Sequence, residues 1–227
     1  YYSPRDLLDI ALNKPAVFEP GSQFKYTNTN YIVLSLLVEK VTHRPLAEQI
    51  TKRITEPLGL THTYYPGPGE EDIRGQHPQG YHVNSQGELE DVTRLDPSWG
   101  GGAGAMISTP SELTKFLQAT LNGTLLNQDS ITEMKKTVDT DHPEIWMGGY
   151  GLGIFPMSLS CGGEAWGHSG GIHGYGSYNM VSPDGTAVAL TVTAMPHGLV
   201  SDPTDMETLL QKAKLMPDAV DSLLCNR

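Results

Sequence analysis

The sequence is poor in basic residues, with 15 Lys and Arg against 26 Asp and Glu in 227 residues, which gives a net charge of −11. Nucleic acids and anionic membrane surfaces bind clusters of Lys and Arg, so we expect neither as a partner. The longest apolar stretch, Tyr31–Val38, is interrupted by Ser35. It is far below the roughly 20 residues that a transmembrane helix requires. We therefore expect no membrane span.

Cysteine is also scarce, because Cys161 and Cys225 are the only two in the chain. An even count in an acidic sequence permits one disulfide and a secreted location but does not prove either. The chain begins Tyr1-Tyr2-Ser3, with no Met and no basic or apolar leader. We therefore expect a processed product or a segment of a longer protein.

The order of the predicted elements indicates an α+β fold. Helical patterns come first, and the helix Asn30–Val41 is apolar on nearly every face, which predicts that it is buried. Strand patterns and a closing helical region follow. We therefore divide the chain into an α-rich region, 1–145, and a region of antiparallel strands with a C-terminal helical part, 146–227. The expected helices are Ser3–Leu12, Asn30–Val41, one opened by Pro45, one from Thr109 to Gly123, and two after Asp205 and Pro217; the expected strands are Tyr81–Val83, Tyr150–Phe155, Ala165–Gly167, Gly174–Ser182 and Thr186–Ala194.

Two stretches carry side chains with catalytic potential. Tyr26 and Asn28 are two residues apart just before the apolar helix, where a phenol can move a proton and an amide can hold a substrate carbonyl. The alternative is that Asn28 or Thr29 caps the helix while Tyr26 packs. His168 lies among small residues in a predicted strand, which suits the pairing of a substrate peptide along its edge. The alternative there is a Gly-rich turn with a solvated histidine.

Taken together, these motifs resemble the penicillin-recognising serine hydrolases, which include class C β-lactamases, D-aminopeptidases and related esterases. The similarity is closest to the actinomycete D-alanyl-D-alanine carboxypeptidase/transpeptidase type. It implies a β-lactamase/transpeptidase-like α+β fold, truncated at its N-terminus, with an antiparallel sheet and packing helices. The residues that carry it are, in order, Tyr26–Tyr31, Glu56–Thr63, Tyr150–Gly153, Leu159–Cys161, His168–Gly170 and Cys225.

The resemblance implies roles for three residues in the first half of the chain. Tyr26 matches the tyrosine that shuttles protons to and from the nucleophile and the leaving group. Asn28 matches the asparagine that binds the amide on the acyl side of the substrate. Trp99 is similar, more loosely, to an aromatic residue that lines the same cleft.

The resemblance also implies roles for the triplet His168-Ser169-Gly170 and for Gly171. The triplet matches the Lys-Thr-Gly or His-Thr-Gly sequence on the strand that lines the family's cleft. There Ser169 would bind the substrate's carboxylate end, and the N–H of Gly171 would complete the oxyanion hole. The similar cysteine pair of the relatives implies a Cys161–Cys225 disulfide.

Two departures from the family pattern affect activity and specificity. The only Ser-x-x-Lys, Ser22–Lys25, follows Pro20-Gly21 in a predicted loop rather than opening a buried helix, so we expect the nucleophile to lie outside this chain. Phe155 and Gly171 stand where the carboxypeptidase pattern has an arginine and a threonine that bind the carboxylate of D-Ala. Their loss favours an esterase, amidase or endopeptidase specificity.

The resulting hypothesis is a secreted serine hydrolase that acts through an acyl-enzyme on D-alanyl peptides or β-lactams, without metal or organic cofactor. The alternatives are an esterase or amidase of the same fold, and a non-catalytic binding module that keeps the cleft. Expected partners are a stem-peptide, β-lactam or ester substrate and the missing N-terminal portion of the same enzyme. We interpret Glu70, Glu71, Asp72, His77 and His82 as a solvated acidic loop, because their spacing fits no known metal-ligand pattern.

Overall fold

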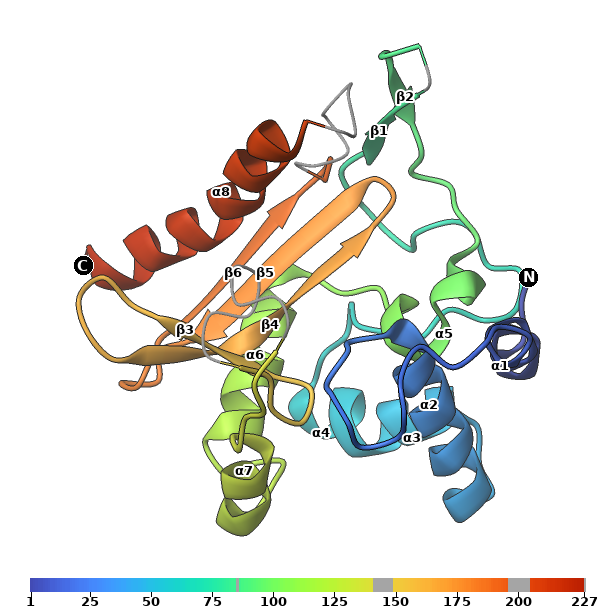
Figure 1. Ribbon diagram of the computed structural model, residues 1–227, viewed down its shortest axis with the longest axis horizontal. Coiled ribbons are helices and arrows are strands. Elements are labelled where there is room, and N and C mark those ends of the chain that lie inside the picture. The colour runs from blue at the N-terminus through green and yellow to red at the C-terminus, as the bar shows by residue number, and fades with distance from the viewer. Residues whose placement is uncertain (85, 141–148, 196–204, 227) are drawn as a thin grey trace. The chain divides into compact units, whose positions relative to one another are not determined.

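The computed structural model of the protein describes residues 1–84, 86–140, 149–195 and 205–226 (Figure 1). The chain forms two compact units, Tyr1–Asp72 with Leu95–Thr109 and Ile73–Arg94 with Pro110–Arg227. These units interleave along the chain, and our division at residues 145 and 146 stays a prediction.

The first unit is built from helices and short turns. α1 is capped as the sequence predicts: Ser3 Oγ accepts a hydrogen bond from the N–H of Asp6, and the Asp6 carboxylate accepts one from the N–H of Ser3. The elements of this unit are α1 (Pro4–Leu12), α2 (Asn28–Thr42), α3 (Leu46–Ile50), η1 (Thr51–Thr55), α4 (Glu56–Leu58), η2 (Pro97–Gly100) and α5 (Gly101–Gly104).

Helix α2 forms where the sequence predicts a helix, but the prediction that it is buried is wrong. Only Ile32 and Ser35 are buried among its residues. These two face α5, where Gly101 and Gly102 let the backbones approach so closely that an added Cβ would lie 2.6 Å from Ile32 Cδ1 and 2.7 Å from Ser35 Cβ. The prediction failed because apolar residues all around a helix do not show how many of its faces other elements cover. In α2 the buried residues lie on one face.

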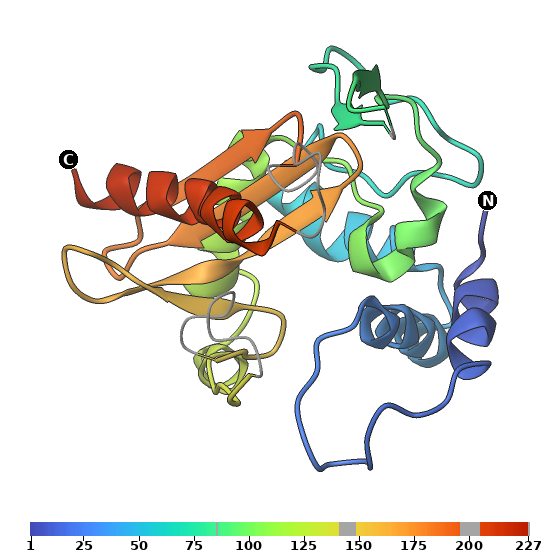
Figure 2. The ribbon, with the colours of Figure 1, turned by 45° about the horizontal axis from the view of Figure 1, so that its top comes forward.

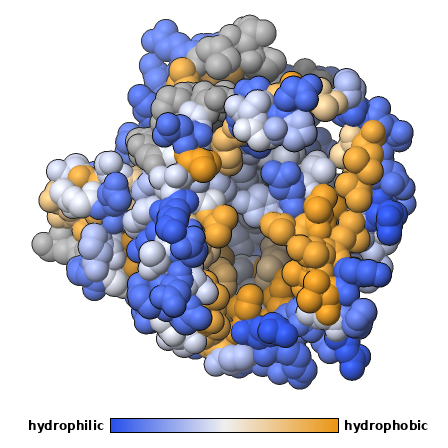
Figure 3. Space-filling model, turned by 60° about the horizontal axis from the view of Figure 1, so that its bottom comes forward, coloured by the Kyte–Doolittle hydropathy of each residue, from blue (hydrophilic) through white to orange (hydrophobic). Residues whose placement is uncertain are grey.

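The other faces of α2 expose large apolar side chains. Val33, Leu34, Leu37 and Val41 are 45–70% exposed. The space-filling view shows hydrophobic side chains gathered in a continuous band on one side of the face it draws (Figure 3). Exposed apolar patches of this kind mark surfaces that another polypeptide, ligand or membrane covers.

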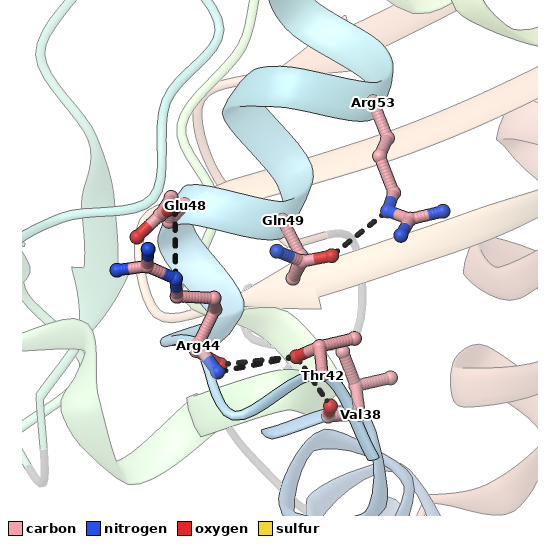
Figure 4. Close-up of polar contacts among 6 residues, drawn as sticks. All are labelled: Val38, Thr42, Arg44, Glu48, Gln49 and Arg53. Carbon is pink, nitrogen blue, oxygen red and sulfur yellow. Dashed lines mark hydrogen bonds and ion pairs between the residues drawn. The ribbon is translucent and has the colours of Figure 1, made fainter. Parts of the chain in front are cut away.

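The junction between α2 and α3 is held by local polar contacts (Figure 4). His43 ends α2 in the left-handed region, with φ of 55°. The Thr42 hydroxyl donates a hydrogen bond to the carbonyl of Val38 at 2.7 Å and accepts one from the N–H of Arg44 at 3.3 Å. Arg44 then pairs with Glu48 at 3.8 Å on the surface of α3.

The second unit contains an antiparallel sheet in the order β3-β4-β5-β6. Helices α6 and α8 both contact β5 and β6, and they cover opposite faces of the sheet (Figures 1 and 2). The elements are β1 (Tyr81–Val83), β2 (Leu89–Asp91), α6 (Pro110–Leu121), α7 (Gln128–Met134), β3 (Phe155–Ser158), β4 (Glu164–Ile172), β5 (Tyr175–Val181), β6 (Ala187–Val192) and α8 (Met206–Cys225). This arrangement is the α+β fold that the sequence predicts.

The expected strand Tyr150–Phe155 is wrong, because β3 begins only at Phe155. Gly149 and Gly153 adopt φ of 90° and 79°, a left-handed conformation that breaks an extended strand. Tyr150 instead forms an isolated bridge with Val138. A tight turn joins β5 to β6, with the N–H of Gly185 donating to the carbonyl of Ser182 at 2.9 Å.

The two helical segments expected near the C-terminus form one helix, α8, with Pro217 inside it. Proline removes one backbone hydrogen bond, but the apolar face of α8 continues through it. Met216, Val220 and Leu224 are all buried. Packing of this face therefore outweighs the local preference of proline to end a helix.

The predicted disulfide between Cys161 and Cys225 is present, with a Cα–Cα distance of 5.5 Å. It joins the loop before β4 to the end of α8. The N–H of Ser160 also donates to Asp221 Oδ1 at 2.8 Å, so the same loop is held to α8 by a second contact. In the described part of the chain, none of the helices has the length and hydrophobicity needed to cross a membrane.

Candidate active site

The candidate residues fall into two groups, one in each unit. In the first unit, Tyr26 lies just before α2 and is half-buried, with its ring centroid 5.7 Å from that of Tyr31. Burial raises the pKa of Tyr26, and the neighbouring Tyr31 adds to the effect. The phenol is therefore protonated at neutral pH in this chain, so it can donate a proton but needs a nearby cation to act as a base.

Asn28 and Trp99 both have exposed side chains. Asn28 is the first residue of α2, and the helix is capped by Thr27, whose hydroxyl accepts from the N–H of Thr29 at 3.2 Å. Neither Asn28 nor Thr29 is thus the capping residue that the alternative interpretation requires. Trp99 lies in η2 and is 39% exposed.

The only Ser-x-x-Lys of the sequence has the wrong geometry for a nucleophile and its base. Residues 22–25 form no helix. The Ser22 hydroxyl donates to the carbonyl of Glu19 at 2.7 Å within the loop. A lysine that activates a serine must lie one helical turn away from it, so this pair does not carry the chemistry.

In the second unit, the remaining candidates lie together on β4, as the sequence predicts. His168–Gly171 pair with Gly176–Asn179 of β5 on one side. On the other side, β3 pairs only with Glu164–Gly167. Among the described residues, Ser169–Ile172 therefore has an edge with no ladder partner. Such an edge offers backbone donors and acceptors to an extended peptide.

His168 is anchored inside the protein through both nitrogens of its ring. Its Nε2 lies 2.8 Å from the hydroxyl of Tyr150, and its Nδ1 contacts the carbonyl oxygen of Ser169. Phe155 adds an edge contact, with ring centroids 5.5 Å apart. Burial lowers the pKa of His168, so the imidazole is neutral at pH 7. It is therefore not the cation that a substrate carboxylate would need.

Two further residues beside His168 belong to this site, and the sequence motifs do not single them out for it. Tyr150, the partner of Nε2, falls in the expected strand that does not form. Asn179 lies opposite His168 in the β4–β5 ladder, and its Oδ1 is buried without a hydrogen-bond partner among the described residues. The alternation along β5 could have placed Asn179 on the same face of the sheet as His168.

Phe155, which stands where the family pattern has an arginine, is buried in the second unit, and its effect on specificity stays a prediction. Phe155 is 1% exposed and packs against Tyr178, with ring centroids 6.0 Å apart. Gly171, by contrast, is exposed on β4. An added Cβ there would approach Met195 Cε to 2.6 Å, so a larger residue requires that side chain to move.

A separate cavity of about 810 Å³ lies near the start of β4. Its wall includes Trp166 and Lys135, whose Nζ lies 5.3 Å from the ring centroid of the indole. None of the residues predicted for the active site lines this cavity.

The fold and the His168–Gly171 strand agree with a family match. The sequence model of the family described as Beta-lactamase matches residues 1–214. The chain belongs to the beta-lactamase family. This confirms the family that the motifs around Tyr26 and His168 indicate.

Relatives within this family are longer than the chain. A putative D-alanyl-D-alanine carboxypeptidase of Escherichia coli K12 is 23% identical over 92% of this chain but only 53% of its own length. A D-stereospecific amidohydrolase from Streptomyces sp. is 34% identical with a TM-score of 0.81, over 94% of this chain and 61% of that chain. A D-amino acid amidase from Ochrobactrum anthropi SV3 has a TM-score of 0.75 at 23% identity, over 98% of this chain and 64% of that chain. The chain thus spans about half to two thirds of these proteins.

Proposed function

We propose that this chain supplies the substrate-binding strand and the proton-transferring tyrosine of an amide hydrolase that acts on D-amino acid amides or peptides. The observation that carries the proposal is the edge of β4 at Ser169–Ile172, which has no ladder partner among the described residues, in a chain 34% identical to a D-stereospecific amidohydrolase. The names of the other two relatives also refer to D-configured substrates. A β-lactam or an ester remains the alternative acyl donor.

In the proposed reaction, a serine hydroxyl attacks the amide carbonyl and forms a tetrahedral oxyanion. The leaving amine takes a proton, and the acyl group stays on the serine as an ester. Water then attacks the ester, giving the free acid and restoring the serine. Tyr26 would move the proton between the serine and the leaving nitrogen. The N–H of Gly171 would stabilise the oxyanion, a donor typically worth about 3–4 kcal/mol.

The proposal places the serine and its lysine outside these 227 residues. Three observations support this placement. Ser22 and Lys25 lie in a loop, and the matched relatives extend well beyond the aligned region. The exposed apolar side chains of α2, such as Leu34 and Leu37, offer a surface on which further polypeptide can pack. We also propose a secreted location, supported by the Cys161–Cys225 disulfide.

The test compares the full-length protein with residues 1–227. D-Phenylalanine amide and L-phenylalanine amide serve as substrates, and a fluorescent penicillin with mass spectrometry detects an acyl-enzyme. The proposal expects D-selective hydrolysis and a serine adduct in the full-length protein only. An adduct on Ser22 of the short chain, or no hydrolysis of either enantiomer, would contradict it.

The second candidate is a binding module that keeps the cleft without catalysis. It is favoured by the raised pKa of Tyr26, because burial holds the phenol in its protonated form. In this case the full-length protein would bind D-amino acid amides without turning them over. Equilibrium binding measured beside the hydrolysis assay separates the two functions.

A further inference from the structure

Two histidines from distant parts of the sequence meet in the second unit. His82 lies in β1 rather than in the solvated loop that we expect from the sequence, and His173 lies in the turn between β4 and β5. Their ring centroids are 4.8 Å apart, and the ring planes are inclined by 33°. Neither residue has a role in the function proposed above.

The backbone fixes the two histidines next to each other. Tyr81, beside His82, forms a bridge with Gly174, beside His173, and its N–H donates to the carbonyl of Thr193 at 2.8 Å. Gly80 allows this approach, because an added Cβ would lie 2.6 Å from the ring of Tyr175. The hydroxyl of Tyr175 in turn donates to the carbonyl of Pro78 at 2.8 Å.

The ring of His82 has a nitrogen for which the described residues supply no partner. Its Nδ1 is buried and makes no hydrogen bond within that part of the chain. Buried polar atoms in folded proteins are almost always paired, so an unpaired imidazole nitrogen beside a second imidazole needs an explanation. A shared ligand between the two rings would provide the missing partner.

We propose that His82 and His173 bind a divalent transition-metal ion such as Zn²⁺, Ni²⁺ or Cu²⁺. Neutral imidazole is a preferred ligand for these ions, whereas Mg²⁺ and Ca²⁺ select oxygen. With metal–nitrogen bonds of about 2.0–2.1 Å, two imidazoles at a tetrahedral angle have centroids about 5 Å apart. The observed 4.8 Å fits this arrangement.

The site takes two ligands from the chain. No third His, Cys, Asp or Glu joins the pair to form a metal-binding group within the described residues. Water or a bound molecule completes the coordination, which leaves positions open at the ion. The net charge of −11 favours the approach of a cation. The proposal is independent of the amide-hydrolase function, because its test needs no catalysis.

The experiment titrates the chelator-treated chain, prepared without a histidine tag, with ZnCl₂, NiCl₂ and MgCl₂ in a calorimeter. The wild type should bind one equivalent of Zn²⁺ or Ni²⁺ and no Mg²⁺. His173→Ala and His82→Ala should each weaken binding at least tenfold. His77→Ala is the matched control, because His77 is an exposed histidine of the same unit, and it should bind like the wild type.

A direct spectroscopic readout complements the titration. Electron paramagnetic resonance of bound Cu²⁺ should show two imidazole nitrogens in the wild type and one in His173→Ala. Should His82→Ala fail to fold, the His173→Ala variant still decides the question. Absence of binding by the wild type, or wild-type affinity in a folded His173→Ala variant, would overturn the proposal.

Discussion

The hydroxyl of Tyr150 lies 2.8 Å from Nε2 of His168, and this contact determines the state of the imidazole. The other nitrogen, Nδ1, faces the carbonyl of Ser169, which can only accept a hydrogen bond. The neutral ring therefore carries its hydrogen on Nδ1 and accepts a hydrogen bond from the Tyr150 hydroxyl at Nε2. His168 is therefore a neutral residue, and its contact with Tyr150 holds β4 to the segment before β3.

Tyr150→Phe should lower the free energy of unfolding by about 1–3 kcal/mol, because it removes the hydroxyl that lies 2.8 Å from the part-buried Nε2 of His168. Urea denaturation of the 227-residue chain measures the change. Tyr81→Phe is the matched control, since its hydroxyl donates to Gln79 Oε1 on the surface. It should cost less than about 0.5 kcal/mol. Equal effects of the two changes would contradict a special role for the Tyr150 contact.

The depressed pKa of His168 predicts a pH dependence of stability. Burial lowers this pKa below the ordinary 6.5 in the folded state, while the unfolded chain keeps it. As the pH falls below 6.5, the unfolded chain binds a proton at His168 before the folded protein does, so the free energy of unfolding falls. Above pH 6.5 both states are neutral at this residue, and the stability contribution is complete. Denaturation at pH 7.5 and 5.5 should show a smaller loss in His168→Gln than in the wild type and in the control His77→Ala. The same loss in all three would contradict the assignment.

Local sequence signals predicted where helices and strands form better than they predicted how these elements pack against one another. The cap of α1 was predictable because Ser3 and Asp6 are three residues apart and satisfy each other. The exposure of α2 was not, because it depends on how many elements cover the helix. The contact between Tyr150 and His168 was missed for a similar reason. It crosses 18 residues of chain and requires the turn at Gly153 rather than the strand that the pattern indicated.

The function of Tyr26 can be tested in the full-length protein. If Tyr26 moves the proton, Tyr26→Phe should lower kcat by about 10²–10⁴ without unfolding the protein. Tyr31→Phe serves as the control, because it removes the hydroxyl of a tyrosine whose ring centroid lies 5.7 Å from that of Tyr26. Its expected effect on kcat is much smaller. Near-normal turnover of Tyr26→Phe would return this residue to a packing role.

The disulfide should stabilise the chain by restricting its unfolded state. Cys161 and Cys225 are 64 residues apart, for which chain-entropy arithmetic gives about 4 kcal/mol as an upper value. Cys161→Ser with Cys225→Ser should therefore lower the urea midpoint strongly, and a reducing agent should do the same to the wild type but not to the variant. Thiol titration of the denatured, unreduced wild type should find no free thiol. Two thiols per chain would contradict the disulfide and remove the main support for a secreted location.

The apolar surface of α2 gives a prediction that separates folding of this chain from assembly with more polypeptide. Leu34 and Leu37 are 50% and 53% exposed, whereas Ile32 on the same helix is 4% exposed. Leu34→Glu with Leu37→Glu should leave the unfolding free energy of residues 1–227 within about 1 kcal/mol of the wild type, since little packing is lost. Ile32→Ala, the control for a covered position, should cost about 2–4 kcal/mol.

In the full-length protein, Leu34→Glu with Leu37→Glu should destabilise the fold much more than it does in residues 1–227. If further polypeptide covers this surface, two buried carboxylates without partners should lower stability by several kcal/mol. In the short chain the same pair should reduce binding of a hydrophobic dye and self-association in analytical ultracentrifugation, because the exposed patch is interrupted. Equal, small effects of Leu34→Glu with Leu37→Glu in both forms would mean that α2 stays uncovered, and would remove one of the supports for placing the nucleophile outside these residues.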